Sequence, residues 1–478
     1  MSEITKLEPK LVWELFDAIT RVPRPSKKEE KIREFLVDFA KKHNIDYQTD
    51  ETSNVVMRVP GTKGYENRPC VILQSHMDMV CEKNSDTAFD FDKDPIRTKI
   101  VDGWVKAEGT TLGADDGIGM AAALAALLDP ALEHGPLEAL FTVDEETGLT
   151  GAFGLGKGML TGRYLVNLDS EDEGEIFIGC AGGVDTLATF RYKTEAAPEA
   201  HVFFRVRVSD LSGGHSGDDI DKGRMNSNKL VARLLWNGAQ RFGLRLSRFD
   251  GGNLRNAIPR EAYAVFAVPS GSKAGFEAFY KEFAGELAAE AKFREPNFKI
   301  GIEEVPAAST QRNLLYALVG LPNGVIEMSL AMPGLVETST NLASVKFEGD
   351  DRIVVTTSQR SSVESAKVYA SQMIESVFAL AGAEVSHSEG YPGWAPNPQS
   401  KLLEITVASY EKLFGVKPKV RAIHAGLECG LFLEKYPHLE MVSFGPTLRG
   451  VHSPDERLEI ATIPKFWDLL ADILKKVE

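Results

Sequence analysis

The first third of the chain alternates between two hydrophobic patterns. Short apolar runs rich in β-branched and aromatic residues predict strands at Asn54–Val59, Cys70–Leu73, Leu137–Val143 and Tyr164–Leu168. Longer segments with helical periodicity lie between them, including Ile118–Leu128. Another runs to Lys42, and Ser26 followed by Glu29 predicts a capping box at its start. This alternation predicts an α/β domain with a mostly parallel sheet covered by helices.

The pattern changes between about Thr186 and His387. Val202–Val208 alternates between apolar and polar residues, as a half-buried strand does, and long helices are predicted over Asn226–Gln240 and Lys273–Lys292. The α/β pattern then returns in Ser400–Phe414, Met441–Phe444 and Ile463–Lys476. We therefore expect an α/β domain in two pieces, 1–185 and 389–478, interrupted by a large inserted α+β domain, 186–388.

Composition and charge exclude several classes of protein. The 478 residues are 43% hydrophobic and 26% charged, which is typical of a globular protein with more than one domain. A net charge of -15 argues against binding to nucleic acid or to an anionic membrane. The longest apolar run, Gly117–Leu128, is too short to cross a bilayer. Without a visible secretion signal, and with four scattered cysteines, the expected location is cytoplasmic.

Histidines and carboxylates follow four of the predicted strands. His76 and Asp78 follow the second strand, Glu145 and Glu146 the third, Asp169 the fourth, and His452 a short loop after Met441–Phe444. Ligands of open α/β sheets bind at the carboxyl ends of the strands. We therefore expect these side chains to meet at one edge of the sheet.

Each of these motifs is ambiguous when taken alone. His76 and Asp78 could form an imidazole–carboxylate pair at a metal, but such pairs also arise by chance. Asp115, between two glycines before an alanine-rich helix, could cap that helix or bridge two cations. Of the neighbouring Glu145 and Glu146, one could bind a metal and leave the other as a general base. Together the residues favour zinc, cobalt or manganese over calcium.

Several longer segments resemble one known family. They span nearly the whole chain in the family's order: Gln74–Val80, Gly109–Met120, Asp169–Glu175, Gly179–Gly183, Gly213–Gly217, Leu254–Glu261, His424–Gly430 and His452–Glu456. The chain resembles the bacterial aminoacyl-histidine dipeptidases, which are part of the co-catalytic zinc peptidase family that includes carnosinase and the aminoacylases. The resemblance implies a zinc-peptidase catalytic domain in pieces 1–185 and 389–478, with 186–388 as a lid domain.

The resemblance also assigns roles around two divalent metal ions, which it implies are zinc, with cobalt or manganese as alternatives. It implies one ion held by His76, Asp115 and Asp169, and a second held by Asp115, Glu146 and His452. Asp78 would orient His76, and Glu145 would act as the general base on a zinc-bridged water. The peptide bond after Asp115 would be cis.

Substrate contacts are expected in the inserted domain and in the loop near residue 426. The resemblance implies that His215 contacts the substrate carbonyl, and that Asn256, Arg360 and Gly426 bind substrate. Arg360 is suited to a carboxylate because its guanidinium is a planar fork. The resemblance implies that an aspartate at position 169 accompanies dipeptidases and aminopeptidases in this family, whereas glutamate accompanies carboxypeptidases and aminoacylases. The resemblance also allows a homodimer.

The expected function is the hydrolysis of small peptides, namely β-alanyl-histidine and other unblocked dipeptides. The nearest alternative is an amidohydrolase of the same fold that cleaves N-acyl amino acids. A non-catalytic metal-binding protein would be expected to lack Glu145 or a ligand, and none is missing. A magnesium phosphohydrolase would need mainly carboxylates and a phosphate-binding loop, which two histidine ligands argue against.

Overall fold

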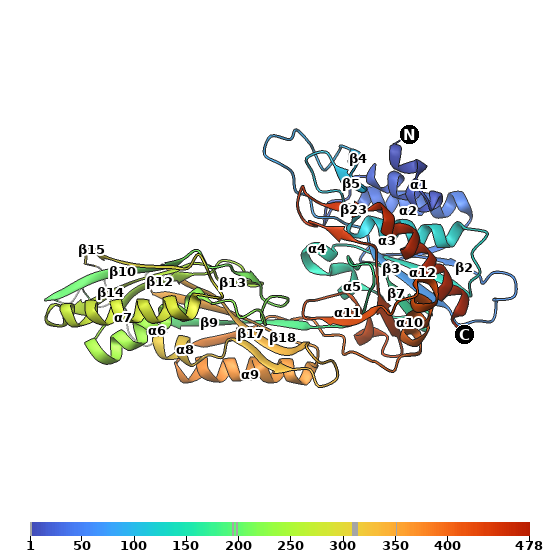
Figure 1. Ribbon diagram of the computed structural model, residues 1–478. Helices are drawn as coiled ribbons and strands as arrows, with labels where there is room; N and C mark the ends of the chain where they lie inside the picture. The colour runs from blue at the N-terminus through green and yellow to red at the C-terminus, as the bar shows by residue number, and fades with distance from the viewer. Residues whose placement is uncertain (1, 194–195, 197–198, 308–313, 350) are drawn as a thin grey trace. The chain divides into compact units, whose positions relative to one another are not determined.

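The chain forms two compact units in the computed structural model, which describes residues 2–193, 196, 199–307, 314–349 and 351–478 (Figure 1). The first unit comprises Met1–Gly179, Pro396–Ala422 and Glu428–Glu478. The second comprises Cys180–Ala395 and the short return Ile423–Leu427, which the hydrophobic pattern does not indicate. Each unit has its own sheets and helices and is described by itself.

An eight-stranded sheet forms the centre of the first unit, in the order β1-β2-β6-β3-β7-β21-β8-β20. Its strands are β1 (Asp46–Thr49), β2 (Val55–Val59), β3 (Val71–His76), β6 (Leu137–Thr142), β7 (Tyr164–Asn167), β8 (Glu175–Cys180), β20 (Lys419–Ile423) and β21 (Glu440–Ser443). A smaller sheet has the order β22-β23-β5-β4, with β4 (Thr98–Val101), β5 (Trp104–Ala107), β22 (Leu448–Arg449) and β23 (Arg457–Glu459).

Four neighbouring strands of the large sheet are parallel: β6, β3, β7 and β21. Every residue of β3, β6 and β7 is buried, as expected for strands covered on both faces. In the register, His76 lies opposite Thr142, and Gln74 lies opposite Asn167. The carboxyl ends of these strands therefore share one edge, which confirms the predicted parallel sheet.

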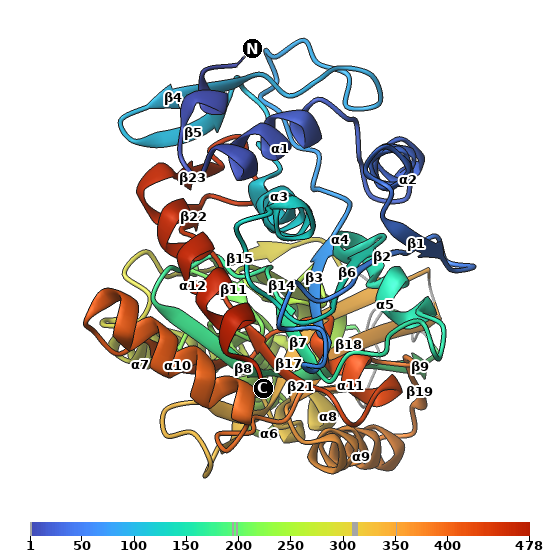
Figure 2. The ribbon, with the colours of Figure 1, turned by 90° about the vertical axis from the view of Figure 1, so that its right-hand side faces the viewer.

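Helices flank this sheet. They are α1 (Lys10–Thr20), α2 (Glu30–His43), α3 (Ala114–Leu128), α4 (Glu145–Gly148), α5 (Thr150–Gly154), α10 (Lys401–Phe414), α11 (Cys429–Lys435) and α12 (Ile463–Lys476), with 3-10 turns at Glu3–Lys6 and Ile460–Thr462. Helix α1 packs on α3, which lies against β3 and β6, while α10 packs on α12 and β21 (Figure 2). Helix α12 buries Phe466, Leu470 and Ile473, a helical spacing that matches its predicted range.

The predicted capping box at Ser26 is wrong. Helix α2 begins at Glu30, and Glu29 occupies the N-cap position without a side-chain cap. The Glu29 carboxylate instead accepts hydrogen bonds from the backbone N–H groups of Lys27, at 2.8 Å, and Asp144, at 3.0 Å. The Glu29 carboxylate therefore accepts a hydrogen bond from a distant segment of the chain. In a capping box it would instead accept one from the N-cap residue of its own helix.

The second unit contains an antiparallel sheet of nine strands, in the order β15-β10-β14-β12-β17-β18-β9-β19 with β16 paired to β17. Its strands are β9 (Gly182–Arg191), β10 (His201–Ser209), β12 (Arg245–Gly251), β14 (Ala262–Pro269), β15 (Lys299–Val305), β16 (Gly324–Met328), β17 (Val336–Glu348), β18 (Arg352–Ser361) and β19 (Glu384–His387). A two-stranded sheet pairs β11 (Gly214–His215) with β13 (Ala257–Ile258).

Four helices lie along one side of the nine-stranded sheet (Figure 1). They are α6 (Ser227–Phe242), α7 (Lys273–Ala291), α8 (Leu314–Gly320) and α9 (Glu364–Leu380), and a 3-10 turn at Ser270–Ser272 precedes α7. Phe276 of α7 is fully buried, and its ring contacts those of Phe204, Phe242, Phe266 and Phe279. This aromatic group belongs to the core between the helices and the sheet. The second unit is therefore an α+β structure, with one layer of helices packed on one sheet.

No helix in the described part of the chain is both long and apolar enough to cross a membrane.

Candidate metal centre

The carboxyl ends of the parallel strands carry the residues that the sequence indicates. His76 is the last residue of β3, and Asp78 follows it by two positions. Glu145 and Glu146 begin the short helix α4 after β6, and Asp169 follows β7 by two positions. Each of these side chains therefore starts from the same edge of the sheet.

Asp115 lies between two histidines. Its Oδ1 is 3.0 Å from Nε2 of His76, and its Oδ2 is 3.3 Å from Nε2 of His452. A second carboxylate accompanies each histidine: Asp169 Oδ1 is 3.6 Å from His76 Nε2, and Glu146 Oε2 is 3.0 Å from His452 Nε2. Two groups of three side chains thus share the Asp115 carboxylate, and each group is compact enough to hold a metal ion.

Asp115 occupies an irregular start of helix α3. Gly113 before it has φ of 67°, in the left-handed region, and Asp115 and Asp116 depart from helical backbone angles. The Asp115–Asp116 peptide bond is cis, which confirms the implied cis linkage. His452 also adopts a left-handed backbone, with φ of 60°.

Asp78 is fully buried and contacts both the ligand histidine and the Glu145–Glu146 turn. Its Oδ1 lies 3.3 Å from His76 Nδ1, an ion-pair separation from which a carboxylate can orient an imidazole. It also accepts hydrogen bonds from the backbone N–H groups of Glu145, at 3.0 Å, and Glu146, at 3.2 Å. Ser26 Oγ donates to its Oδ2 at 2.7 Å. One carboxylate therefore fixes the histidine and the adjacent acidic turn together.

Carboxylates outnumber imidazoles in this cluster, and their charges shift the pKa values. Burial alone would lower the pKa of His76, but Asp169, Asp115 and Asp78 raise it well above its usual value. Hydrogen bonds to Asp115 and Glu146 raise the pKa of His452 to about 11. Burial also raises the pKa of Glu145 well above its usual value, and the nearby His76 only partly offsets this.

These features suit bound cations. Glu146 Oε1 is buried and has no hydrogen-bond partner among the described residues. A divalent ion would satisfy that oxygen and would neutralise the excess of buried negative charge. Imidazole nitrogens and carboxylate oxygens at this spacing are ligands of zinc and of similar borderline ions. The residues therefore fit a pair of metal ions.

Glu428 extends the cluster beneath the strand ends. It is 2% exposed, and its Oε2 accepts hydrogen bonds from Gln74 Nε2, at 2.6 Å, and Thr142 Oγ1, at 2.8 Å. Burial raises its pKa to about 7. Asn167 Nδ2 in turn donates to Gln74 Oε1 at 2.5 Å. The sequence did not single out this network, although Glu428 lies within the segment His424–Gly430.

The residues predicted to bind substrate gather in the second unit. His215 in β11 pairs with Ala257 in β13, and the N–H of Ser216 donates to the Asn256 carbonyl at 2.8 Å. Buried Arg360 in β18 donates from Nε to Ser216 Oγ at 3.4 Å and from Nη1 to Tyr391 Oη at 2.8 Å.

The tyrosine also brings the Gly426 loop into this group. A Cβ on Gly426 would lie 2.9 Å from the Tyr391 ring, so glycine leaves room for that side chain. His215, Asn256, Arg360 and Gly426 are therefore linked through Ser216 and Tyr391 within one unit.

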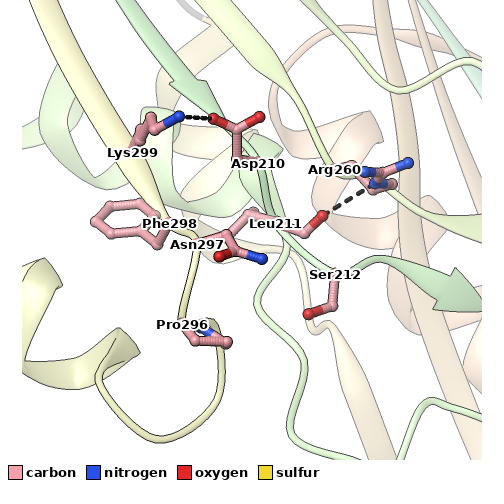
Figure 3. A pocket seen from close by; sticks show the side chains of 8 residues that line it. All are labelled: Asp210, Leu211, Ser212, Arg260, Pro296, Asn297, Phe298 and Lys299. Atoms are coloured by element: carbon pink, nitrogen blue, oxygen red, sulfur yellow. Dashed lines mark hydrogen bonds and ion pairs between the residues drawn. The ribbon is translucent and has the colours of Figure 1, made fainter.

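A separate hollow in the second unit contains none of these residues. It is lined by Asp210, Leu211, Ser212, Arg260, Pro296, Asn297, Phe298 and Lys299 (Figure 3). Lys299 Nζ pairs with Asp210 at 2.9 Å, and Arg260 Nε donates to the Leu211 carbonyl at 2.9 Å. Because the lining charges pair with protein groups, we give this hollow no catalytic role.

Comparisons with known proteins agree with this geometry. The model of a family described as "Peptidase family M20/M25/M40" matches residues 72–476. The chain is 42% identical over 483 residues to the cytosol non-specific dipeptidase of Escherichia coli strain K12, covering 100% of this chain and 99% of the relative.

Solved structures extend this similarity to the fold. The aminoacylhistidine dipeptidase of Vibrio alginolyticus matches with a TM-score of 0.93 and 44% identity, covering 100% of this chain and 98% of that one. A tripeptidase of Staphylococcus aureus matches with a TM-score of 0.58 and 16% identity, covering 98% and 99% of the two chains, which shows the fold alone.

Proposed function

The chain belongs to peptidase family M20/M25/M40, and from this premise we propose that it is a two-metal dipeptidase. Its substrates are unblocked dipeptides, including aminoacyl-histidine dipeptides such as β-alanyl-histidine. The observation that carries the proposal is Asp115, whose two oxygens face His76 and His452 separately. Relatives that cover the whole chain at 42% and 44% identity are named dipeptidases.

We assign the ligands in two sets that share Asp115. His76 and Asp169 complete the first set, and Glu146 and His452 complete the second. The ions are zinc, with cobalt or manganese as alternatives that suit the same nitrogen and oxygen ligands. When bound, such ions polarise a carbonyl oxygen and lower the pKa of a bound water.

The protein side chains supply positioning and proton transfer. Asp78 holds His76 through Nδ1, so that Nε2 faces Asp115 and Asp169. Glu145 receives a proton from the attacking water and delivers it to the amine nitrogen as the carbon–nitrogen bond breaks. The backbone N–H of Glu145 donates a hydrogen bond to Asp78. This bond fixes the position of Glu145 and does not involve the Glu145 carboxylate.

The second unit supplies the proposed substrate contacts. His215 is assigned to the substrate carbonyl, and Asn256 and Gly426 to the bound peptide. Arg360 is assigned to the free carboxylate of the substrate. Its guanidinium has N–H donors in addition to the two that bond to Ser216 and Tyr391. These four assignments rest on the resemblance and on the cluster within the second unit.

Two features favour a dipeptidase over an amidohydrolase of N-acyl amino acids. Residue 169 is aspartate, which by the resemblance accompanies dipeptidases and aminopeptidases and not aminoacylases. The relatives named dipeptidases are similar along the whole chain. Glu145 and every proposed ligand are present, which also argues against a non-catalytic metal-binding protein. We propose the cytosol as its location, as the name of the Escherichia coli relative indicates for that protein.

A substrate panel combined with metal analysis tests the proposal. Purified protein loaded with zinc is incubated with β-alanyl-histidine, simple dipeptides and N-acetyl amino acids, and free amines are measured. We expect the dipeptides to be cleaved, and Glu145→Ala to retain two zinc ions while losing more than 95% of activity, because a general base contributes a factor of about 10²–10⁴. Cleavage of N-acetyl amino acids alone would support the amidohydrolase, and an active Glu145→Ala would refute the role of Glu145.

A further inference from the structure

The Glu456 carboxylate holds the turn that carries Asp115. Glu456 is 2% exposed and follows His452 by four positions. Its oxygens accept hydrogen bonds from consecutive backbone N–H groups of Leu112 (2.7 Å), Gly113 (2.9 Å), Ala114 (2.8 Å) and Asp115 (3.3 Å). Hydrogen bonds to an ionised acceptor are about twice as strong as neutral ones, so this carboxylate fixes the turn firmly.

Arg24 holds the same turn through one carbonyl group, that of Gly113. Its guanidinium is buried, with 2% of the residue exposed, and it donates to the carbonyls of Met77, at 3.0 Å, and Asp78, at 2.6 Å. It also donates to the carbonyl of Gly113. A Cβ at Gly113 would lie 2.6 Å from Nη2 of Arg24, so glycine is needed for this approach. Arg24 therefore ties the Asp115 turn to the segment that follows His76.

We propose that Glu456 is a positioning residue, which keeps Asp115 and His452 aligned as ligands of the same metal ion. One side chain links the two ligands, because it is four residues from His452 in sequence and accepts a hydrogen bond from Asp115 itself. Arg24 supports the turn through the Gly113 carbonyl. The inference rests on the proposed two-metal function and adds a residue outside the ligand set.

Two substitutions separate the charge of Glu456 from its shape. Glu456→Gln keeps the length, but its NH₂ group would face two backbone N–H groups that need an acceptor. Glu456→Asp keeps the charge on a side chain shorter by one methylene group. Both variants retain His452, Asp115 and the other proposed ligands.

Glu138 provides a matched control. It is also buried, with 1% exposed, and its carboxylate accepts hydrogen bonds from the N–H groups of Thr161, at 2.9 Å, and Gly162, at 3.0 Å. It lies near the start of β6, whereas the candidate ligands follow the ends of the strands. Glu138→Gln therefore perturbs a buried carboxylate of the same unit without perturbing the proposed metal ligands.

The experiment measures zinc binding, stability and kinetics in parallel. Metal-free wild-type protein, Glu456→Gln, Glu456→Asp and Glu138→Gln are titrated with zinc in a calorimeter. Their melting temperatures are recorded without metal, and kcat and KM are measured on a dipeptide with excess zinc. The zinc titration also tests Glu456 if the wild-type protein cleaves no dipeptide, so failure of the proposed function would be recognised separately.

We expect Glu456→Gln to bind one of its two zinc ions 10- to 100-fold more weakly, the range seen when residues supporting metal ligands are removed. Its kcat should fall while KM changes little, and Glu456→Asp should recover part of the zinc affinity. Glu138→Gln should melt at a lower temperature with unchanged zinc affinity. If Glu456→Gln does not fold, Glu456→Asp decides. Wild-type zinc affinity in whichever variant folds would overturn the proposal.

Discussion

Replacing Asp78 by asparagine tests how the buried carboxylate supports the candidate metal centre. The substitution keeps the shape of the side chain but removes its charge and one acceptor oxygen. Asp78 is 0% exposed and accepts hydrogen bonds from Ser26 and from the N–H groups of Glu145 and Glu146, while lying 3.3 Å from His76. The asparagine NH₂ can donate to Ser26, which leaves the Glu146 N–H without an acceptor.

The energetic cost follows from these contacts. A buried N–H without an acceptor costs about 1–3 kcal/mol. The contacts with His76 and Glu145 lose their charge assistance, at about 1 kcal/mol each. We therefore expect the free energy of unfolding of metal-free Asp78→Asn to fall by about 3–5 kcal/mol. Zinc binding at the His76 ligand set should weaken by about 10- to 100-fold, because the imidazole loses the group that orients it.

Urea unfolding of metal-free protein and a zinc competition titration measure the two effects separately. Ser26→Ala is the control, since it removes one donor to Asp78 and leaves the charge in place. The control should lose about 1 kcal/mol of stability and keep its zinc affinity. An Asp78→Asn protein with wild-type zinc affinity and wild-type kcat would refute this role of Asp78.

Other predictions concern separate parts of the molecule. His452→Ala should lower kcat by at least about 100-fold even at saturating zinc, because the second ligand set loses one of its three members; kinetic assays check this. Phe276→Ala should destabilise the second unit by about 3–5 kcal/mol without altering zinc affinity, as calorimetry and zinc titration would show. Burial lowers the pKa of His424 to about 4, below its usual 6.5. The neutral form therefore stabilises the fold above pH 6.5, and that contribution is lost as the pH falls towards 4. Unfolding of wild type and His424→Asn should differ by about 2 kcal/mol more at pH 7 than at pH 5; an unchanged difference would contradict this.

The strand ends were predictable because local patterns place them. Apolar runs indicate β6 and β7, and the polar residues after them must then lie at the carboxyl edge of a parallel sheet. Strand β3 continues past its predicted end at Leu73 to His76. Its polar residue Gln74 is buried because Glu428 and Asn167 supply hydrogen bonds from elsewhere in the sequence. A hydrophobic pattern cannot anticipate such partners.

The supporting residues were harder to predict for the same reason. The Ser26 and Glu29 pattern has the spacing of a capping box, but both side chains serve distant partners, Asp78 and Asp144. The contacts of Glu456 with the Asp115 turn depend on chain segments that only tertiary folding brings together. Sequence motifs therefore indicated the candidate ligands, whereas the buried charges behind them required the structure.

The central claim is that one carboxylate serves two metal ions. Calorimetric titration of metal-free protein with zinc, for the wild type and for Asp115→Asn, tests it most directly. Both Asp115 oxygens face a histidine, so the account predicts two bound zinc ions in the wild type and weakened binding of both in the variant. A wild type that binds a single zinc ion, or a variant that still binds two with unchanged affinity, would contradict it.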